Sequence, residues 1–287
     1  MRGLIPDHIQ VTIDPVINTS SKRALAQSVF YYLKRFCMNS IRESIRIGFE
    51  DGGVLVPRFV EYKESEVTRI RRGEVLRYSG IPADILRKDG LGRFDVSYLD
   101  TEVDSDADDK ALSDSRGELV RIMDDVLKLT DKKFTYRVAY CVAPIEWENE
   151  VAHLPISKDS LDLSRNLEGC SHALIFAATV GSGIDLLIRR YERTDSIRGL
   201  LLQGLGAERA EALCDTFCRD IKSAAIAEGM DIKPRYSPGY GDLPITVQPD
   251  VLRLVNAEKR LGITLNASYL MSPSKSVTAI VGLCISE

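Results

Sequence analysis

The stretch Ala173–Thr179, with the sequence ALIFAAT, is an uninterrupted apolar run with the length of a buried strand. The glycine turn Gly181–Gly183 follows it and leads into a helical pattern over Ile184–Arg190. A longer helical pattern then covers Asp195–Glu228, and Gly229 is expected to cap it. The chain therefore predicts a buried strand, a tight turn and two helices in succession.

Further elements are predicted on both sides of this stretch. Strands are expected at Val54–Tyr62, Phe134–Val142, Ile263–Met271 and Ser276–Cys284, and helices at Leu119–Leu127, Ser160–Leu167 and Gln248–Leu261. The last two strands flank Ser272–Lys275, which is expected to join them as a hairpin. Helices interleaved with strands and a closing hairpin favour a mixed α+β fold, because a doubly wound sheet would need more evenly spaced βαβ units.

Two regions of different character are predicted. Residues 1–64 form an N-terminal extension of unknown role, with a weak strand pattern at His8–Ile13 and a helical one from Ser21 to Phe36. Residues 65–287 form the main domain. The acidic run Asp100–Asp109 predicts a solvated loop inserted into that domain at about residues 95–115.

Composition excludes several classes of function. The chain has 287 residues, 44% of them hydrophobic and 28% charged, with a net charge of -4, which is typical of a globular protein. It lacks the clustered excess of Lys and Arg that marks nucleic-acid binding. No apolar run approaches the roughly 20 residues of a membrane span, and no signal peptide is evident. We therefore expect a cytoplasmic protein without nucleic-acid or membrane partners, whose six cysteines are reduced thiols.

No metal site is predicted. A calcium-binding loop starting at Asp104 would place Asp109 where glycine is needed and Ser115 where a bidentate glutamate is needed. Cys214 and Cys218 lie on one face of the long helix, but zinc would want two further ligands. Buried, inert thiols are the better interpretation of this pair.

Two loops have the composition of ligand-binding loops. Gly181–Gly183 could present backbone N–H groups to an anion, but Leu186 stands where a dinucleotide fingerprint has its third glycine, so a plain turn is favoured. The loop Arg235–Pro244 holds two prolines and two glycines and is therefore stiff and irregular. Its Arg235 could hold a carboxylate by two parallel hydrogen bonds, and Gly239 would let a ligand approach the backbone closely. Composition alone favours an ordinary surface turn here.

The second loop carries a resemblance. Arg235–Tyr240, with the sequence RYSPGY, resembles the R-x-x-x-G-Y signature of the activation (reactivation) domain of cobalamin-dependent methionine synthase. Other patches are similar to that family in the same order: Gly73–Tyr78, Phe176–Thr179, Ala207–Leu213, Glu258–Leu265 and Ser268–Pro273. The resemblance extends from about Val67 to Leu283, and Gly73–Tyr78 looks like the opening of stand-alone forms of the domain.

The resemblance implies a mainly antiparallel, twisted sheet with flanking helices. It implies an S-adenosylmethionine-binding reactivation subunit, in methionine biosynthesis, that supports reductive methylation of cob(II)alamin. The cobalamin would be carried by a methionine synthase subunit, and a flavodoxin or ferredoxin-type donor would supply the electron. Whether the protein is itself an enzyme stays open, since it would be an accessory part of a methyltransferase system without catalytic residues of its own.

The resemblance also implies roles for individual residues. Arg235 would bind the carboxylate of the methionine moiety, and Glu211 matches an acidic ligand contact. Tyr236 and Gly239 belong to the loop that contacts the ligand, Tyr236 through its backbone, and Tyr240 would face the corrin ring. An alternative is a non-catalytic module that senses S-adenosylmethionine or docks another corrinoid methyltransferase.

Overall fold

A computed structural model describes residues 41–46, 57–81 and 105–285, with side chains from residue 117 onward in the last segment. The predicted strand His8–Ile13 and the helix from Ser21 to Phe36 lie outside these ranges. Within them, residues 41–46 are helical and bury Ile41 and Ile45 completely.

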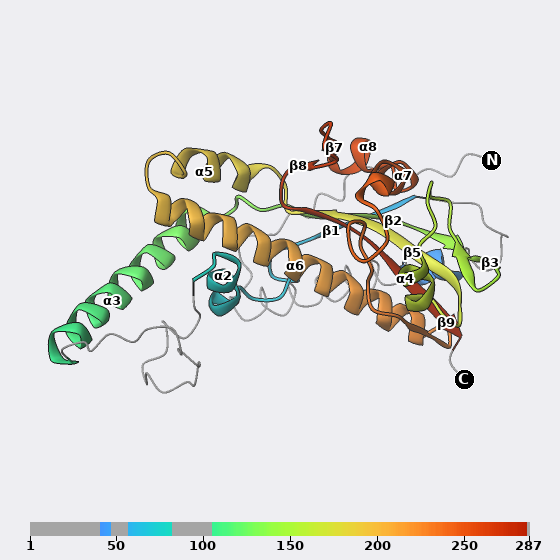
Figure 1. Ribbon diagram of the computed structural model, residues 1–287, viewed down its shortest axis with the longest axis horizontal. Helices are drawn as coiled ribbons and strands as arrows, with labels where there is room; N and C mark the ends of the chain where they lie inside the picture. The colour runs from blue at the N-terminus through green and yellow to red at the C-terminus, as the bar shows by residue number, and fades with distance from the viewer. Residues whose placement is uncertain (1–40, 47–56, 82–104, 286–287) are drawn as a thin grey trace, which may run out of the picture.

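The described part of the chain forms a five-stranded sheet with the order β1-β2-β5-β9-β6 (Figure 1). Its strands are β1 (Arg58–Tyr62), β2 (Tyr136–Pro144), β5 (Cys170–Thr179), β6 (Met230–Ile232) and β9 (Ser276–Ile285). Every neighbouring pair is antiparallel. The predicted fold class, a mixed α+β fold with a mainly antiparallel sheet, is confirmed.

The middle strand β5 is buried on both faces, which explains its unbroken apolar sequence. Leu174, Phe176 and Ala178 belong to the core on one face of the sheet. Ala173, Ile175 and Ala177 alternate with them and belong to a second core on the other face. An apolar run without alternation is what a strand covered on both sides requires.

Helices cover both faces. The first face is covered by the helices α2 (Arg72–Tyr78), α3 (Ser105–Leu129), α5 (Gly183–Tyr191) and α6 (Ser196–Ile226). The second face is covered by α4 (Leu161–Asn166), the short helix η2 (Ile245–Val247), α7 (Gln248–Leu254) and α8 (Ala257–Leu261). Small two-stranded sheets pair β3 (Glu146–Glu148) with β4 (Val151–His153) and β7 (Thr264–Leu265) with β8 (Met271–Ser272).

The long helix α6 organises the first face. It runs along the sheet in Figure 1, while α3 projects beyond one end of the sheet. The helix begins at Ser196, close to the predicted start, and the side chain of its N-cap Asp195 accepts a hydrogen bond from the Arg198 N–H. Phe217 of α6 packs against Tyr140 and Phe176 of the sheet, with ring centroids 5.3 and 5.1 Å apart. The helix ends at Ile226 and its C-cap is Ala227, two residues before the expected Gly229.

Two predictions at the C-terminal side are wrong. The single helix expected at Gln248–Leu261 is split into α7 and α8 by Asn256, whose φ of 54° is left-handed, a conformation that asparagine tolerates. The closing hairpin does not form, because β9 pairs with β5 and β6 while β8 pairs with β7. The Asn266 side chain supports the turn between β7 and β8 by accepting hydrogen bonds from the N–H groups of Ser268 and Leu270, both at 2.9 Å.

The predicted acidic loop is also corrected in part. From Ser105 onward the chain is helical and belongs to α3, so residues 105–115 are not a loop. Residues 95–104 lie outside the described ranges.

The cysteine prediction is wrong for one pair. Cys170 and Cys284 lie opposite each other in the register of β5 and β9 and form a disulfide. The two cysteines lie 114 residues apart, so no spacing pattern in the sequence indicates this pairing. Cys141, Cys214 and Cys218 are free thiols. Among the described residues, no helix has the length and apolar composition needed to cross a lipid bilayer.

Candidate functional site

The Arg235–Tyr240 loop begins after β6 and is fixed to the central sheet. The N–H of Tyr236 donates to the carbonyl of Ile280 on β9, and the N–H of Ile280 donates back, both at 2.8 Å. The Tyr236 side chain is buried. The backbone at Tyr236 is therefore as well anchored as a strand residue.

The second half of the loop folds back on Tyr236. The Tyr236 hydroxyl donates to the Tyr240 carbonyl at 3.2 Å, and the two rings meet edge to face with centroids 5.5 Å apart. Gly239 has a φ of 90°, which favours glycine, and its N–H donates to the Leu243 carbonyl at 2.8 Å. These contacts leave Tyr240 70% exposed.

Asp242 ties the end of the loop to helix α4. Its carboxylate accepts hydrogen bonds from the Ser160 hydroxyl and from the N–H groups of Leu161, at 2.8 Å, and Asp162, at 3.2 Å. The bond from Ser160 is the largest of the effects that lower the pKa of Asp242. The loop is thus held at both ends by groups from separate elements.

The structure brings the predicted ligand residues Arg235 and Glu211 together. Glu211 lies on α6, and its carboxylate accepts a hydrogen bond from Nη2 of Arg235. The other terminal nitrogen, Nη1, lies 3.3 Å from Oδ1 of Asp215, one helical turn further along α6. The side chains of Arg235 and Glu211 are 27% and 31% exposed, so the pair is open to a ligand.

Arg235 is positively charged at neutral pH. Burial acts to lower the pKa of Arg235, but its neighbours, among them Cys214 and Glu211, outweigh burial and raise it. Burial also raises the pKa of the nearby Cys218 thiol to about 11, with Arg235 acting in the opposite sense. The guanidinium therefore faces two carboxylates and protonated thiols at neutral pH.

A second arginine, which sequence reasoning missed, faces the same helix. Arg71 precedes α2, and its Nη2 lies 3.8 Å from Oδ2 of Asp215. Its backbone N–H and its Nε donate to Oε1 of Glu208, at 3.2 and 3.4 Å. Glu208 is completely buried and pairs with Arg209 through two hydrogen bonds of 2.6 and 2.9 Å. The spacing of Glu208, Glu211 and Asp215 along α6 is the sequence signal that could have revealed this acidic stripe.

This arrangement suits an α-amino acid group. A guanidinium binds a carboxylate through two parallel hydrogen bonds, and a carboxylate binds an ammonium group. Arg235 and Glu211 present these two complementary charges side by side.

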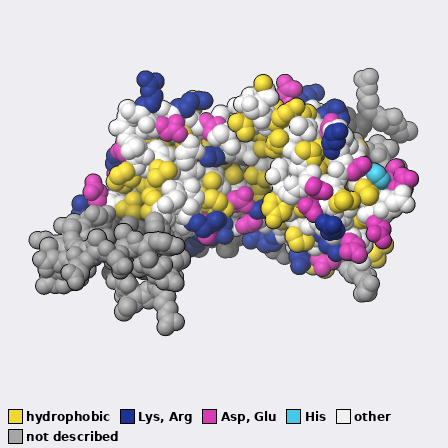
Figure 2. Space-filling view, viewed as in Figure 1, with side chains coloured by type: hydrophobic (Ala, Val, Ile, Leu, Met, Phe, Trp, Pro, Cys, Tyr) yellow, Lys and Arg dark blue, Asp and Glu magenta, His cyan; other side chains and the backbone are white. Residues whose placement is uncertain are grey.

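Figure 2 shows hydrophobic side chains exposed on one face of the molecule, over the α5–α6 end and the α7–α8 end. Within the described residues, no group of three or more His, Cys, Asp or Glu side chains is arranged to hold a metal ion.

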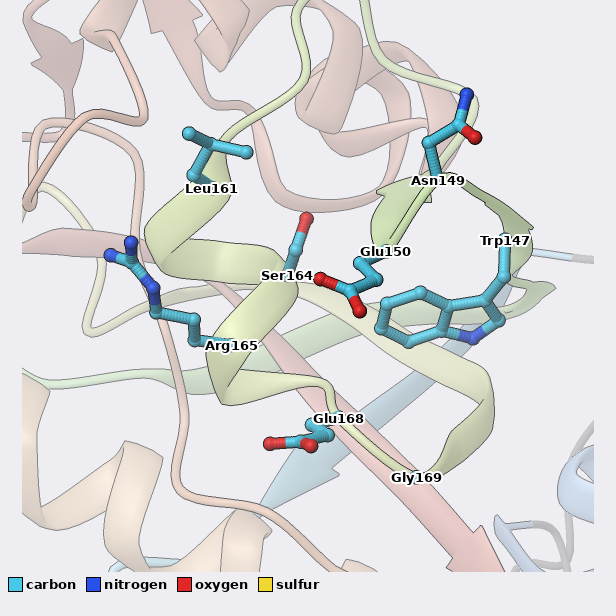
Figure 3. Close-up of a pocket in the computed structure, with 8 residues that line it drawn as sticks. All are labelled: Trp147, Asn149, Glu150, Leu161, Ser164, Arg165, Glu168 and Gly169. Atoms are coloured by element: carbon cyan, nitrogen blue, oxygen red, sulfur yellow. The ribbon is translucent and has the colours of Figure 1, made fainter.

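A pocket of about 590 Å³ lies elsewhere, beside α4 and the β3–β4 hairpin (Figure 3). Figure 3 shows the Trp147 indole beside the Glu150 carboxylate, while Arg165 points away on the other side of α4. The indole is oriented by its N–H, which donates to the Cys170 carbonyl at 2.9 Å. This pocket contains none of the predicted ligand residues.

Comparison with known families supports the resemblance seen in the sequence. Residues 166–284 match the family described as vitamin B12 dependent methionine synthase, activation domain. All five predicted site residues fall within this segment: Glu211, Arg235, Tyr236, Gly239 and Tyr240. A search of curated proteins gave no match.

Comparison with solved structures supports the fold. The crystal structure of the MetH reactivation domain bound to AdoHcy matches with a TM-score of 0.52 and 17% sequence identity. The match covers 81% of this chain and 80% of that chain. The resemblance to the activation domain of cobalamin-dependent methionine synthase is therefore confirmed, by the family match over residues 166–284 and by the fold over most of the chain.

Proposed function

We propose that this protein binds S-adenosylmethionine at the Arg235–Glu211 pair and serves as a separate reactivation subunit for a cobalamin-dependent methionine synthase in the cytoplasm. The family match over residues 166–284 supports this function, as does the similarity in fold to a reactivation domain that was solved with AdoHcy bound. The observation that carries the proposal is the direct contact between Arg235 and Glu211, which lie 24 residues apart in sequence.

The pair would recognise the methionine moiety of the ligand. Arg235 would hold the α-carboxylate, and Glu211 would accept hydrogen bonds from the α-ammonium group. The backbone at Tyr236 and Gly239 would contact the rest of the ligand. Because Tyr236 is fixed to β9, the loop would hold the ligand without a large rearrangement.

Tyr240 would contact the corrin ring of the partner protein. The residue is 70% exposed, although it belongs to a loop that is otherwise well anchored. An aromatic ring offers an apolar face and a polar hydroxyl, which suits a contact with a large ring system. Its position beside the Arg235 loop would bring the ligand and the corrin face close together.

The residues of this protein would contribute binding and orientation. The partner's cobalamin would supply the chemistry: with one external electron it would take the methyl group of S-adenosylmethionine, which would leave as S-adenosylhomocysteine. A flavodoxin or ferredoxin-type protein would supply that electron. Holding the sulfonium methyl group at a fixed position lowers the entropic cost of the transfer.

A reactivation assay tests the function. The protein is mixed with S-adenosylmethionine, a reductant and a methionine synthase that lacks its own activation domain and holds cob(II)alamin. Formation of methylcobalamin is followed by its visible absorbance. We expect formation with the wild type and a loss of at least about tenfold with Arg235→Ala, since one charge-assisted bond contributes about 1.5–3 kcal/mol.

Arg253→Ala is the matched control. Arg253 also pairs with a carboxylate, that of Asp250 at 2.8 Å, but its side chain is 72% exposed on α7. The control should behave as the wild type. Equal reactivation by wild type and Arg235→Ala would contradict the assignment of the site.

A further inference from the structure

We infer that Asp215 competes with the ligand for Arg235, and that ligand binding transfers Asp215 to Arg71. The inference rests on the proposed function and adds two residues to its site. One of them, Arg71, lies outside the segment that matches the family.

Asp215 lies between two guanidinium groups. Its Oδ1 is 3.3 Å from Nη1 of Arg235, and its Oδ2 is 3.8 Å from Nη2 of Arg71. The side chain of Asp215 is 51% exposed, whereas that of Glu211, the other partner of Arg235, is 31% exposed. The more mobile partner of Arg235 is therefore expected to be Asp215.

Both terminal nitrogens of Arg235 are already in use. Nη2 donates to Glu211 and Nη1 to Asp215. A ligand carboxylate that binds the end of the guanidinium takes one N–H from each terminal nitrogen and lies beside both resident carboxylates, so repulsion between like charges favours the departure of one of them. Glu211 is needed for the ammonium group and is the less exposed of the two, which makes Asp215 the one that is displaced.

Arg71 is placed to receive Asp215. The two side chains already approach within 3.8 Å, so a rotation of Asp215 suffices. Arg71 itself is held by two hydrogen bonds to Glu208, which is completely buried. The charge of Asp215 therefore remains paired after it leaves Arg235.

A second electrostatic effect of Asp215 acts on the affinity for S-adenosylmethionine in the opposite direction. S-adenosylmethionine carries a positive sulfonium, which any nearby carboxylate attracts, so loss of Asp215 could also weaken binding. Two arginines already balance the charge of Asp215, and its shortest contact is with the atom that the ligand carboxylate needs. Competition is therefore expected to outweigh attraction.

Titration calorimetry with Asp215→Asn measures which of these two effects on ligand affinity is larger. Binding of S-adenosylmethionine and S-adenosylhomocysteine should tighten by about twofold to fivefold, the range set by partly exposed ion pairs. Binding of 5′-methylthioadenosine, which has no carboxylate, should not change. Glu61→Gln is the control for net charge, because Glu61 pairs with Arg137 at 3.3 Å on the edge strand β1.

The variant Arg71→Gln tests whether Asp215 moves to Arg71 when the ligand binds. Without Arg71 the displaced Asp215 has no second partner, so S-adenosylmethionine should bind about twofold to fivefold more weakly. The same substitution should have little effect when Asp215→Asn is also present. Such a coupling between two substitutions is what a double-mutant cycle detects.

The outcomes separate this inference from the function on which it rests. Weaker or unchanged binding of S-adenosylmethionine by Asp215→Asn would overturn the competition, while binding by the wild type would still support the proposed function. Weakening for S-adenosylmethionine but not S-adenosylhomocysteine would identify Asp215 as a sulfonium contact instead. Failure of both wild type and Asp215→Asn to bind either ligand would overturn the proposed function itself.

Discussion

At the scale of single residues, the proposed Arg235–Glu211 site lies beside a buried ion pair. Arg209 and Glu208 are both almost fully buried, and Arg209 also donates to the Thr68 carbonyl at 2.8 Å. These contacts join the segment before α2 to the helix that carries Glu211. These buried charges therefore help to position the part of α6 that carries Glu211.

Replacing one member of this pair should be costly. Arg209→Met leaves the Glu208 carboxylate buried without its main partner, which is expected to lower the free energy of unfolding by about 3–5 kcal/mol. The double replacement Glu208→Leu with Arg209→Met should cost less than the single one, because it leaves no uncompensated charge. Chemical denaturation measures both, and a single-variant loss below about 1 kcal/mol would contradict this account.

Asp242 should give the protein a pH-dependent contribution to stability. Its folded-state pKa lies below the ordinary value of 3.8, so its stabilising effect is present above that pH and is lost as pH falls through the folded pKa. Asp242→Asn removes this titration. Its melting temperature should lie below that of the wild type near neutral pH, and the gap should narrow below pH 3.8. A gap that stays constant over this range would show that Asp242 does not titrate in this way.

The predictability of the site differs from residue to residue. Arg235, Gly239 and Tyr240 belong to one short loop whose composition and signature are visible in the sequence. Glu211 came only from the resemblance. Arg71 could not be foreseen, because it meets Asp215 from 144 residues away and the sequence does not tell which helix faces which loop.

At the scale of elements, the packing of α2 against α6 positions Arg71. Gly204 of α6 allows this approach, since a Cβ there would lie 2.3 Å from the Val75 carbonyl oxygen and 2.1 Å from the Ser79 hydroxyl. The Ser79 hydroxyl donates to the Val75 carbonyl at 2.8 Å, so this part of α2 is itself ordered. Gly204 therefore meets the backbone of α2 and one ordered hydroxyl, and neither can move aside easily.

Gly204→Ala should destabilise the protein although alanine favours helices. Overlap with the backbone of α2 is expected to cost about 1–3 kcal/mol, which outweighs the gain in helix propensity. Gly117→Ala in α3 is the control, because a Cβ there meets no atom of the described residues within 4 Å. That control should be stabilised by about 0.5–1 kcal/mol. Thermal unfolding of the two variants in opposite directions would support the close approach, and equal effects would contradict it.

Long elements were predictable from the sequence and short ones were not. β5 and α6 have apolar patterns long enough to define them. β6 has three residues and β7 has two, too few for any periodicity to appear. The closing hairpin was mistaken because β9 finds its partners in strands far away in sequence.

At the scale of the whole molecule, the site draws on parts of the chain that are distant in sequence. Residues 166–284 hold β5, β6, β9 and the Arg235 loop, but β1 and β2 complete the sheet and lie before that segment. Arg71 and Thr68 also come from outside it. The segment that matches the family therefore depends on earlier residues for both its core and its charge network.

The binding of S-adenosylmethionine is the central claim, and a calorimetric titration of the 287-residue chain tests it most directly. The account predicts binding by the wild type that Arg235→Ala weakens by at least about tenfold, with Arg253→Ala unaffected. Circular dichroism would establish that the variants are folded. Wild-type binding that Arg235→Ala leaves unchanged, or no binding at all, would contradict the account.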